Sequence, residues 1–71
     1  MQKQSLFIMS KKVKEVILLL QMNGWHLDRI KGDHRIFEKK GQRPVPVSGK
    51  DSDDMPEGLY RAILRQANLK G

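Results

Sequence analysis

Histidine is the side chain through which this chain could most readily do chemistry, because the chain contains two histidines and no cysteine. His34 follows the turn-forming segment Lys31-Gly32-Asp33 and precedes Arg35, so it stands among basic residues at the end of a predicted hairpin. Imidazole gains and loses a proton near neutral pH, which makes His34 a candidate general base. The residues alone also fit an ordinary exposed histidine, and for His26 they favour that second interpretation.

Other kinds of site have little support in the sequence. Two histidines without cysteine, at no close ligand spacing, do not predict a zinc site. The segment Lys31-Gly32-Asp33 is typical of a turn and not of a glycine-rich phosphate loop. Ser48 lacks the elbow motif that would mark it as the nucleophile of a Ser-His-acid triad. We therefore expect neither a metal nor a cofactor.

The chain is basic, with 14 Lys and Arg residues against 8 Asp and Glu residues and a formal net charge of +6. The excess lies in the first fifty residues, whereas the remainder is slightly acidic. This asymmetry predicts an anionic partner, RNA or DNA first and an acidic protein second, although lysines that only maintain solubility explain it equally well. No apolar run approaches the roughly 18 residues of a membrane span, and we expect a cytoplasmic protein.

A length of 71 residues allows one small domain. Residues 1–9 show no periodicity and are interpreted as a disordered or non-native lead, which leaves the domain at residues 10–71. The pattern becomes helical at Ser10, the expected N-cap, and Gly24 is placed to end this helix. The core-facing stripe of the helix is Val13, Val16, Ile17 and Leu20.

Alternating apolar and polar residues predict two strands, 25–30 and 34–39, joined by a tight turn. A three-residue loop would pair Ile30 with His34, and a two-residue loop would shift every pair by one position. We prefer the three-residue loop because it places the large apolar side chains on a single buried face. That face carries Trp25, Leu27 and Phe37, with Leu27 opposite Phe37, and the uncovered face carries His26, Asp28, Ile30, His34, Ile36 and Glu38.

The remaining segments predict one more strand and one more helix. Residues 43–47 are expected to form an edge strand, since Pro44 and Pro46 direct their missing N–H groups to the same side. Asp54 with Glu57 three residues later resembles a capping box, and the helix that follows presents an apolar stripe of Tyr60, Ile63, Leu64 and Ala67. The order predicts a two-layer α+β fold, α-β-β-β-α, with a three-stranded antiparallel sheet and both helices on one face.

Five blocks of the chain form a recognisable pattern: Gly24-Trp25, Lys31-Gly32-Asp33-His34-Arg35-Ile36-Phe37, Val45-Pro46-Val47, Pro56-Glu57-Gly58 and Ile63-Leu64-Arg65-Gln66-Ala67-Asn68-Leu69. In order and spacing, over about residues 10–69, the chain resembles the HicA toxin family. Members of this family are mRNA interferases, endoribonucleases of bacterial type II toxin–antitoxin systems. The resemblance implies a double-stranded-RNA-binding-domain-like fold and a catalytic histidine in a Gly-small-His motif, which corresponds to His34.

The resemblance also implies mRNA as the substrate and a HicB-type antitoxin as the partner that covers His34. RNA cleavage requires a base near the ribose 2′-OH and cations that stabilise the charge developing on the phosphate. We expect His34 to be the base and Lys31, Arg35 and Lys39 to be the RNA-phosphate contacts.

The chain departs from the family pattern in its loops. Leu59 stands where threonine is frequent, Asn68 where glycine is usual, and residues 48–50 where a histidine or proline is common. Two other functions stay open. One is a nonenzymatic RNA-binding module with the same fold. The other is a protein-interaction domain for an acidic partner, in which Leu18 and Met22 on the far side of the first helix would form the docking strip.

Overall fold

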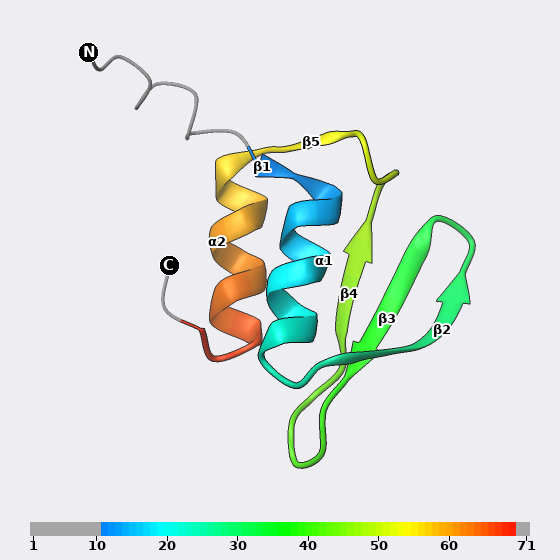
Figure 1. Cartoon of the computed structure of the whole chain (residues 1–71), viewed down its shortest axis with the longest axis vertical. Coiled ribbons are helices and arrows are strands. Elements are labelled where there is room, and N and C mark those ends of the chain that lie inside the picture. The colour runs from blue at the N-terminus through cyan, green and yellow to red at the C-terminus, as the bar shows by residue number, and fades with distance from the viewer. Residues whose placement is uncertain (1–10, 70–71) are drawn as a thin grey trace.

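The computed structural model describes residues 11–69, and the predicted lead at residues 1–9 and the predicted cap Ser10 lie outside them. The elements follow the order β1 (Lys11–Lys12), α1 (Val13–Met22), β2 (His26–Lys31), β3 (His34–Glu38), β4 (Val45–Ser48), β5 (Asp54–Met55) and α2 (Glu57–Gln66) (Figure 1). Neither helix in this part of the chain is long and apolar enough to cross a membrane.

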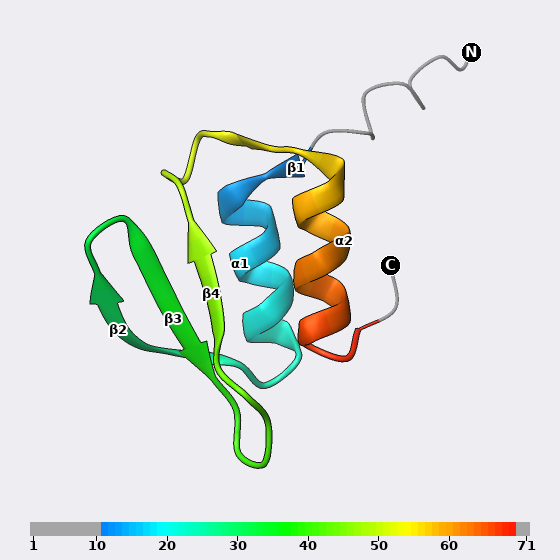
Figure 2. The ribbon, with the colours of Figure 1, turned by 180° about the vertical axis from the view of Figure 1, so that it is seen from behind.

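The two helices lie side by side and cover one face of an antiparallel sheet with the strand order β2-β3-β4 (Figures 1 and 2). Phe37 on β3 pairs with Val45 on β4, so both side chains belong to the same face of the sheet. This face and both helices contribute to one buried cluster, which confirms the predicted two-layer α+β fold. The cluster consists of Val13, Val16, Ile17, Leu20, Trp25, Phe37, Val45, Val47, Met55, Ile63 and Ala67.

The predicted core stripe of α1 is confirmed, but the predicted start of the helix is wrong. The helix begins at Val13, and the N-cap position is Lys12. The first backbone N–H groups of α1 donate to carbonyl oxygens of a distant loop, Val13 to Asp53 at 2.9 Å and Lys14 to Asp51 at 3.1 Å. Because the loop accepts these bonds, the helix needs no serine or threonine as a cap.

Both helices are followed by a residue in the left-handed conformation. Gly24 follows α1 with φ of +91°, a left-handed conformation that glycine adopts without steric cost, as predicted. Asn68 follows α2 with φ of +60°, which asparagine tolerates better than most residues. The buried positions predicted for α2 are confirmed at Ile63, Leu64 and Ala67, and Tyr60 is partly buried.

The predicted capping box at Asp54 is wrong, because Pro56 occupies the N-cap position of α2. Asp54 belongs instead to β5, which pairs with β1. Its carboxylate oxygen lies 2.8 Å from the Nζ of Lys12 and forms an ion pair with it. This two-stranded sheet was not predicted, and it buries Met55 in the core. Strands of two residues are too short to produce a readable alternation.

The predicted hairpin register is wrong at the turn and correct at the far end. The turn has two residues, Gly32 and Asp33, so Lys31 pairs with His34 where Ile30 was expected. A β-bulge between Leu27 and Arg29 absorbs one extra residue, and Leu27 therefore still pairs with Phe37.

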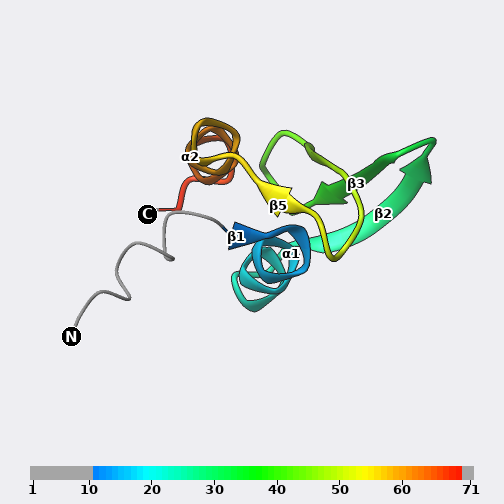
Figure 3. The same cartoon turned by 90° about the horizontal axis from the view of Figure 1, so that it is seen from above.

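The bulge also exchanges the residues on the two faces of β2. Ile30 was predicted on the uncovered face, but it pairs with Arg35, which shares the face of Phe37 and lies toward the helices. Arg29 pairs with Ile36 on the uncovered face. Leu27 lies on the helix side as predicted but is 44% exposed, because β2 is the strand farthest from the helices (Figure 1). The β2–β3 hairpin extends away from both helices (Figure 3).

The third strand, β4, is confirmed as an edge strand paired with β3 alone. It covers Val45–Ser48 and not the predicted residues 43–47, so Pro46 lies within it and Pro44 precedes it. Val45 and Val47 pair with β3 and are fully buried, while Pro46 is exposed.

Candidate functional site

His34 is the first residue of β3, and its side chain is exposed on the face of the sheet that carries no helix, here called the open face. It pairs with Lys31 on β2 and with Ser48 on β4, so these two residues are its direct neighbours across the sheet. Residues opposite each other in an antiparallel pair have Cβ atoms about 5 Å apart. The ammonium group of Lys31 on β2, the imidazole of His34 on β3 and the hydroxyl group of Ser48 on β4 therefore lie in one row across the sheet.

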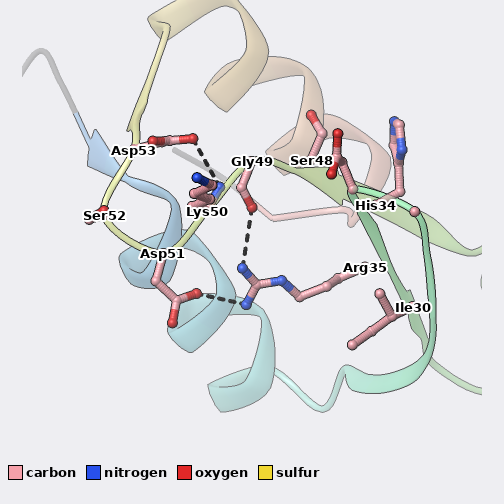
Figure 4. A pocket seen from close by; sticks show the side chains of 11 residues that line it. Ile30, His34, Arg35, Ser48, Gly49, Lys50, Asp51, Ser52 and Asp53 are labelled. Atoms are coloured by element: carbon pink, nitrogen blue, oxygen red, sulfur yellow. Dashed lines mark hydrogen bonds and ion pairs between the residues drawn. The ribbon is translucent and has the colours of Figure 1, made fainter.

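A groove of about 810 Å³ opens beside His34, between the hairpin turn and the loop that follows β4 (Figure 4). Its walls come from residues 32–35 on one side and residues 48–53 on the other, and Ile30 contributes an apolar patch. This is called the His34 groove below. Its charges are mixed, since its lining contains Asp33, Asp51 and Asp53 together with Arg35 and Lys50.

The structure places two of the expected site residues together, because Lys31 pairs directly with His34. None of the ion pairs among residues 11–69 involves Lys31 or Lys50, so both ammonium groups are available to an anionic ligand. Lys31 thus adds positive charge beside His34 on the open face, whereas Lys50 lies on the groove wall formed by residues 48–53, together with Asp51 and Asp53.

Arg35 lines the groove but points away from the open face. Its Nη1 donates to the carboxylate of Asp51 at 2.7 Å, and its Nη2 donates to the carbonyl oxygen of Gly49 at 3.2 Å (Figure 4). Its side chain is 25% exposed. This geometry gives the guanidinium two partners within the protein and favours a structural role over a phosphate contact.

Lys39 lies just beyond the other end of β3, and the structure does not bring it near His34. Five residues of extended chain separate the two, or about 16 Å. Its Nζ donates to the backbone carbonyl of Asn23 at 2.8 Å and closes the end of α1. His26 is exposed at the same end of the sheet, opposite Glu38 as predicted. It is thus also remote from His34.

Asp28 was expected to lie diagonally across from His34, and this expectation is wrong. The residue sits in the β-bulge, and its carboxylate pairs with the neighbouring Arg29 at 2.5 Å. Since Lys31 is the direct partner of His34, the diagonal position on β2 belongs to Arg29.

Two residues of the groove, Ser48 and Lys50, were not expected in the site. The sequence presents Ser48 only as a lone loop serine, without a motif. A usable indication was nevertheless present. Once Phe37 and Val45 are placed opposite each other in the core, counting along the antiparallel pair puts Ser48 opposite His34.

Within residues 11–69, no group of three histidine, aspartate or glutamate side chains is placed to hold a metal ion. The chemistry on the open face therefore has to be described from an imidazole, a hydroxyl group and ammonium groups.

Comparison with known proteins agrees with this geometry. Residues 13–69 match the family model described as the HicA toxin of bacterial toxin-antitoxin. A solved structure described as "Toxin-Antitoxin complex from Streptococcus pneumoniae" contains a chain that is 34% identical, with a TM-score of 0.72, and the match covers 82% of this chain and 97% of that one. A search of curated proteins gives no match. The chain belongs to the HicA toxin family of toxin–antitoxin systems.

Proposed function

We propose that this chain is an mRNA interferase, an endoribonuclease that cleaves messenger RNA with His34 as its general base. The observation that carries the proposal is the row on the open face, in which an exposed histidine stands between a lysine and a serine. Family membership supports the toxin role, and the location of messenger RNA makes the cytoplasm the proposed site of action.

In the proposed reaction His34 accepts the proton of a ribose 2′-OH, and the 2′ oxygen attacks the adjacent phosphorus. The O2′–P bond forms as the P–O5′ bond breaks, which yields a 2′,3′-cyclic phosphate, and the departing 5′ oxygen takes a proton from water. Negative charge gathers on the phosphate oxygens as this happens. Lys31, directly across from His34, would stabilise that charge. His26 lies at the other end of the sheet, which is why the proposal uses a single histidine.

We also propose that the partner of this chain is a HicB-type antitoxin that covers His34. The supporting observations are the exposure of His34 at the rim of an open groove and the similarity to a chain from a toxin–antitoxin complex. A protein seated on the open face would exclude RNA from the row of Lys31, His34 and Ser48.

The test is cleavage of a mixed-sequence RNA by the purified chain and by His34→Ala and His34→Gln variants of confirmed fold. General-base catalysis is worth about 10²- to 10⁴-fold, so both variants are expected to lose at least a hundredfold in rate. DNA of the same sequence is expected to remain intact because it lacks the 2′-OH. Arg65→Gln, an exposed position on α2, is the control that retains cleavage.

Equal cleavage by the wild type and both His34 variants would remove His34 from the mechanism. RNA binding without cleavage by any of the proteins, together with growth arrest on induction of His34→Ala, would favour the nonenzymatic RNA-binding module instead.

A further inference from the structure

The loop at residues 49–53 forms one wall of the His34 groove, and it is held at several points. Two of its carbonyl oxygens accept the first N–H groups of α1, Asp53 from Val13 and Asp51 from Lys14. Within the loop the Lys50 N–H donates to the Asp53 carboxylate, and the Asp53 N–H donates to the Lys50 carbonyl, each at 2.9 Å. These bonds connect the loop to the helix but not to the sheet that carries His34.

Arg35 supplies the connection to the sheet. It lies on β3 next to His34, and its guanidinium reaches two acceptors of the same loop, the Asp51 carboxylate and the Gly49 carbonyl. The planar, forked arrangement of guanidinium donors suits such a pair of acceptors, and a lysine ammonium reproduces it poorly. Because His34 and Arg35 are consecutive in an extended strand, their side chains point to opposite faces.

The position of the loop decides where Ser48 and Lys50 lie. Ser48, the partner of His34, is the last residue of β4, and the chain turns immediately afterwards at Gly49 with φ of +101°. A displacement of the loop would therefore move Lys50 directly and Ser48 through Gly49.

We propose that Arg35 is a positioning residue, which holds loop 49–53 against the sheet so that Ser48 and Lys50 face the RNA phosphate at His34. This inference rests on the proposed ribonuclease function for its catalytic consequence, but the clamp itself is a property of the folded chain. It replaces the expectation that Arg35 contacts RNA directly.

Asp51 separates the two interpretations. If Arg35 is a clamp, Asp51→Asn removes the charged partner of the clamp and impairs catalysis as Arg35→Gln does. If Arg35 binds RNA, Asp51→Asn frees the guanidinium, removes a negative charge from the groove and improves binding and cleavage. Asp51 is 62% exposed, so its replacement does not threaten the core.

The first measurement is hydrogen exchange of loop amides in Arg35→Gln, Asp51→Asn and the double variant, without RNA. We expect the Lys50, Asp53 and Lys14 amides to exchange several-fold faster in all three variants. The matched control is Arg61→Gln, which breaks an Arg–carboxylate pair within α2, Arg61–Glu57 at 2.6 Å, and should leave these amides unchanged. Unchanged exchange in Arg35→Gln would overturn the clamp.

The second measurement is the steady-state kinetics of RNA cleavage. A misplacement of about 1 Å can cost a hundredfold in rate, so each single variant is expected to lose roughly tenfold to a hundredfold in kcat, with a smaller change in KM. The double variant should be no slower than the slower single variant, because both changes break the same contact. Arg35→Lys should recover part of the rate by keeping one donor for Asp51.

Additive losses in the double variant, or a faster Asp51→Asn enzyme, would overturn the positioning role. An inactive wild-type protein would contradict the proposed ribonuclease function and not the clamp, which the exchange data decide separately.

Discussion

Deletion of Asp28 should leave the hairpin pairing intact, although deleting one residue from a strand normally reverses the faces of everything beyond it. Asp28 is the extra residue at the bulge between Leu27 and Arg29. Without it, Leu27 opposite Phe37 and Arg29 opposite Ile36 become consecutive pairs of a regular ladder. The turn and the pairing of Lys31 with His34 need no adjustment.

The expected cost is small because little packing is lost. Asp28 is exposed and makes one ion pair, with Arg29, of the exposed kind that contributes about 0–1 kcal/mol. The matched control is deletion of Ile36, on the strand that has no bulge. That deletion pulls Phe37, which is 1% exposed, out of register with the core, at a cost of about 3–5 kcal/mol. A 71-residue domain has a total stability of about 4–10 kcal/mol, so this variant should lose a large share of its stability.

Thermal and urea unfolding followed by circular dichroism provide the assay. The Asp28 deletion should change the free energy of unfolding by no more than about 1 kcal/mol, which corresponds to about 4–8 °C in Tm for a domain of this size. RNA cleavage should persist, since Lys31 stays opposite His34. A variant without Asp28 that unfolds as readily as the one without Ile36 would refute the assignment of Asp28 as the extra residue.

Three further changes test other parts of the structure. Phe37→Ala should lower the free energy of unfolding by about 3–5 kcal/mol in urea titrations, because it empties a buried aromatic site; an effect below 1 kcal/mol would contradict its place in the core. Gly32→Ala should lower the free energy of unfolding by about 1–2 kcal/mol because Gly32 has a positive φ, and Gly49→Ala should lower it more. Gly49 also has a positive φ, but a Cβ there would lie 3.3 Å from the Val13 side chain, whereas a Cβ at Gly32 would meet nothing within 4 Å. The hydrogen bond and the charge of Asp54 raise the pKa of Lys12 above its ordinary 10.5, so the stabilisation from this pair is complete below that value and is lost as the pH rises through the raised pKa. Between about pH 9 and about pH 12 the free energy of unfolding should therefore fall less in Asp54→Asn than in the wild type. An equal fall in both proteins would exclude the pair as its source.

The helices and most of the core could be predicted because their signals are local. The stripe from Val13 to Leu20 and the one around Ile63 each repeat with the period of a helix, and both are buried. The start of α1 was predicted wrongly because the groups that accept its first N–H groups are carbonyl oxygens of Asp51 and Asp53, some forty residues along the chain. No side-chain motif records a backbone acceptor that folding brings from such a distance.

The same distinction separates the site residues. His34 and Lys31 flank the same turn, so the local sequence placed them near each other, although the preferred three-residue loop made Ile30 the direct partner of His34 and the structure has Lys31 there. Arg35 and Lys39 have partners 16 residues away, Asp51 and the carbonyl of Asn23, and these occupy their charged groups. Charge in a sequence shows how many cations there are, but the fold decides which of them are left for a ligand.

The bulge explains why a lysine and not an isoleucine faces His34. Phe37 must lie on the helix side, and His34, three residues earlier on the same strand, must therefore lie on the open face. A regular ladder with Leu27 opposite Phe37 would place Ile30 opposite His34, an apolar neighbour of no use to an anionic ligand. Lys31 lies four positions after Leu27, but Phe37 lies only three positions after His34, and the bulge absorbs the difference. One extra residue thus satisfies the core at one end of the hairpin and supplies a cation to the histidine at the other.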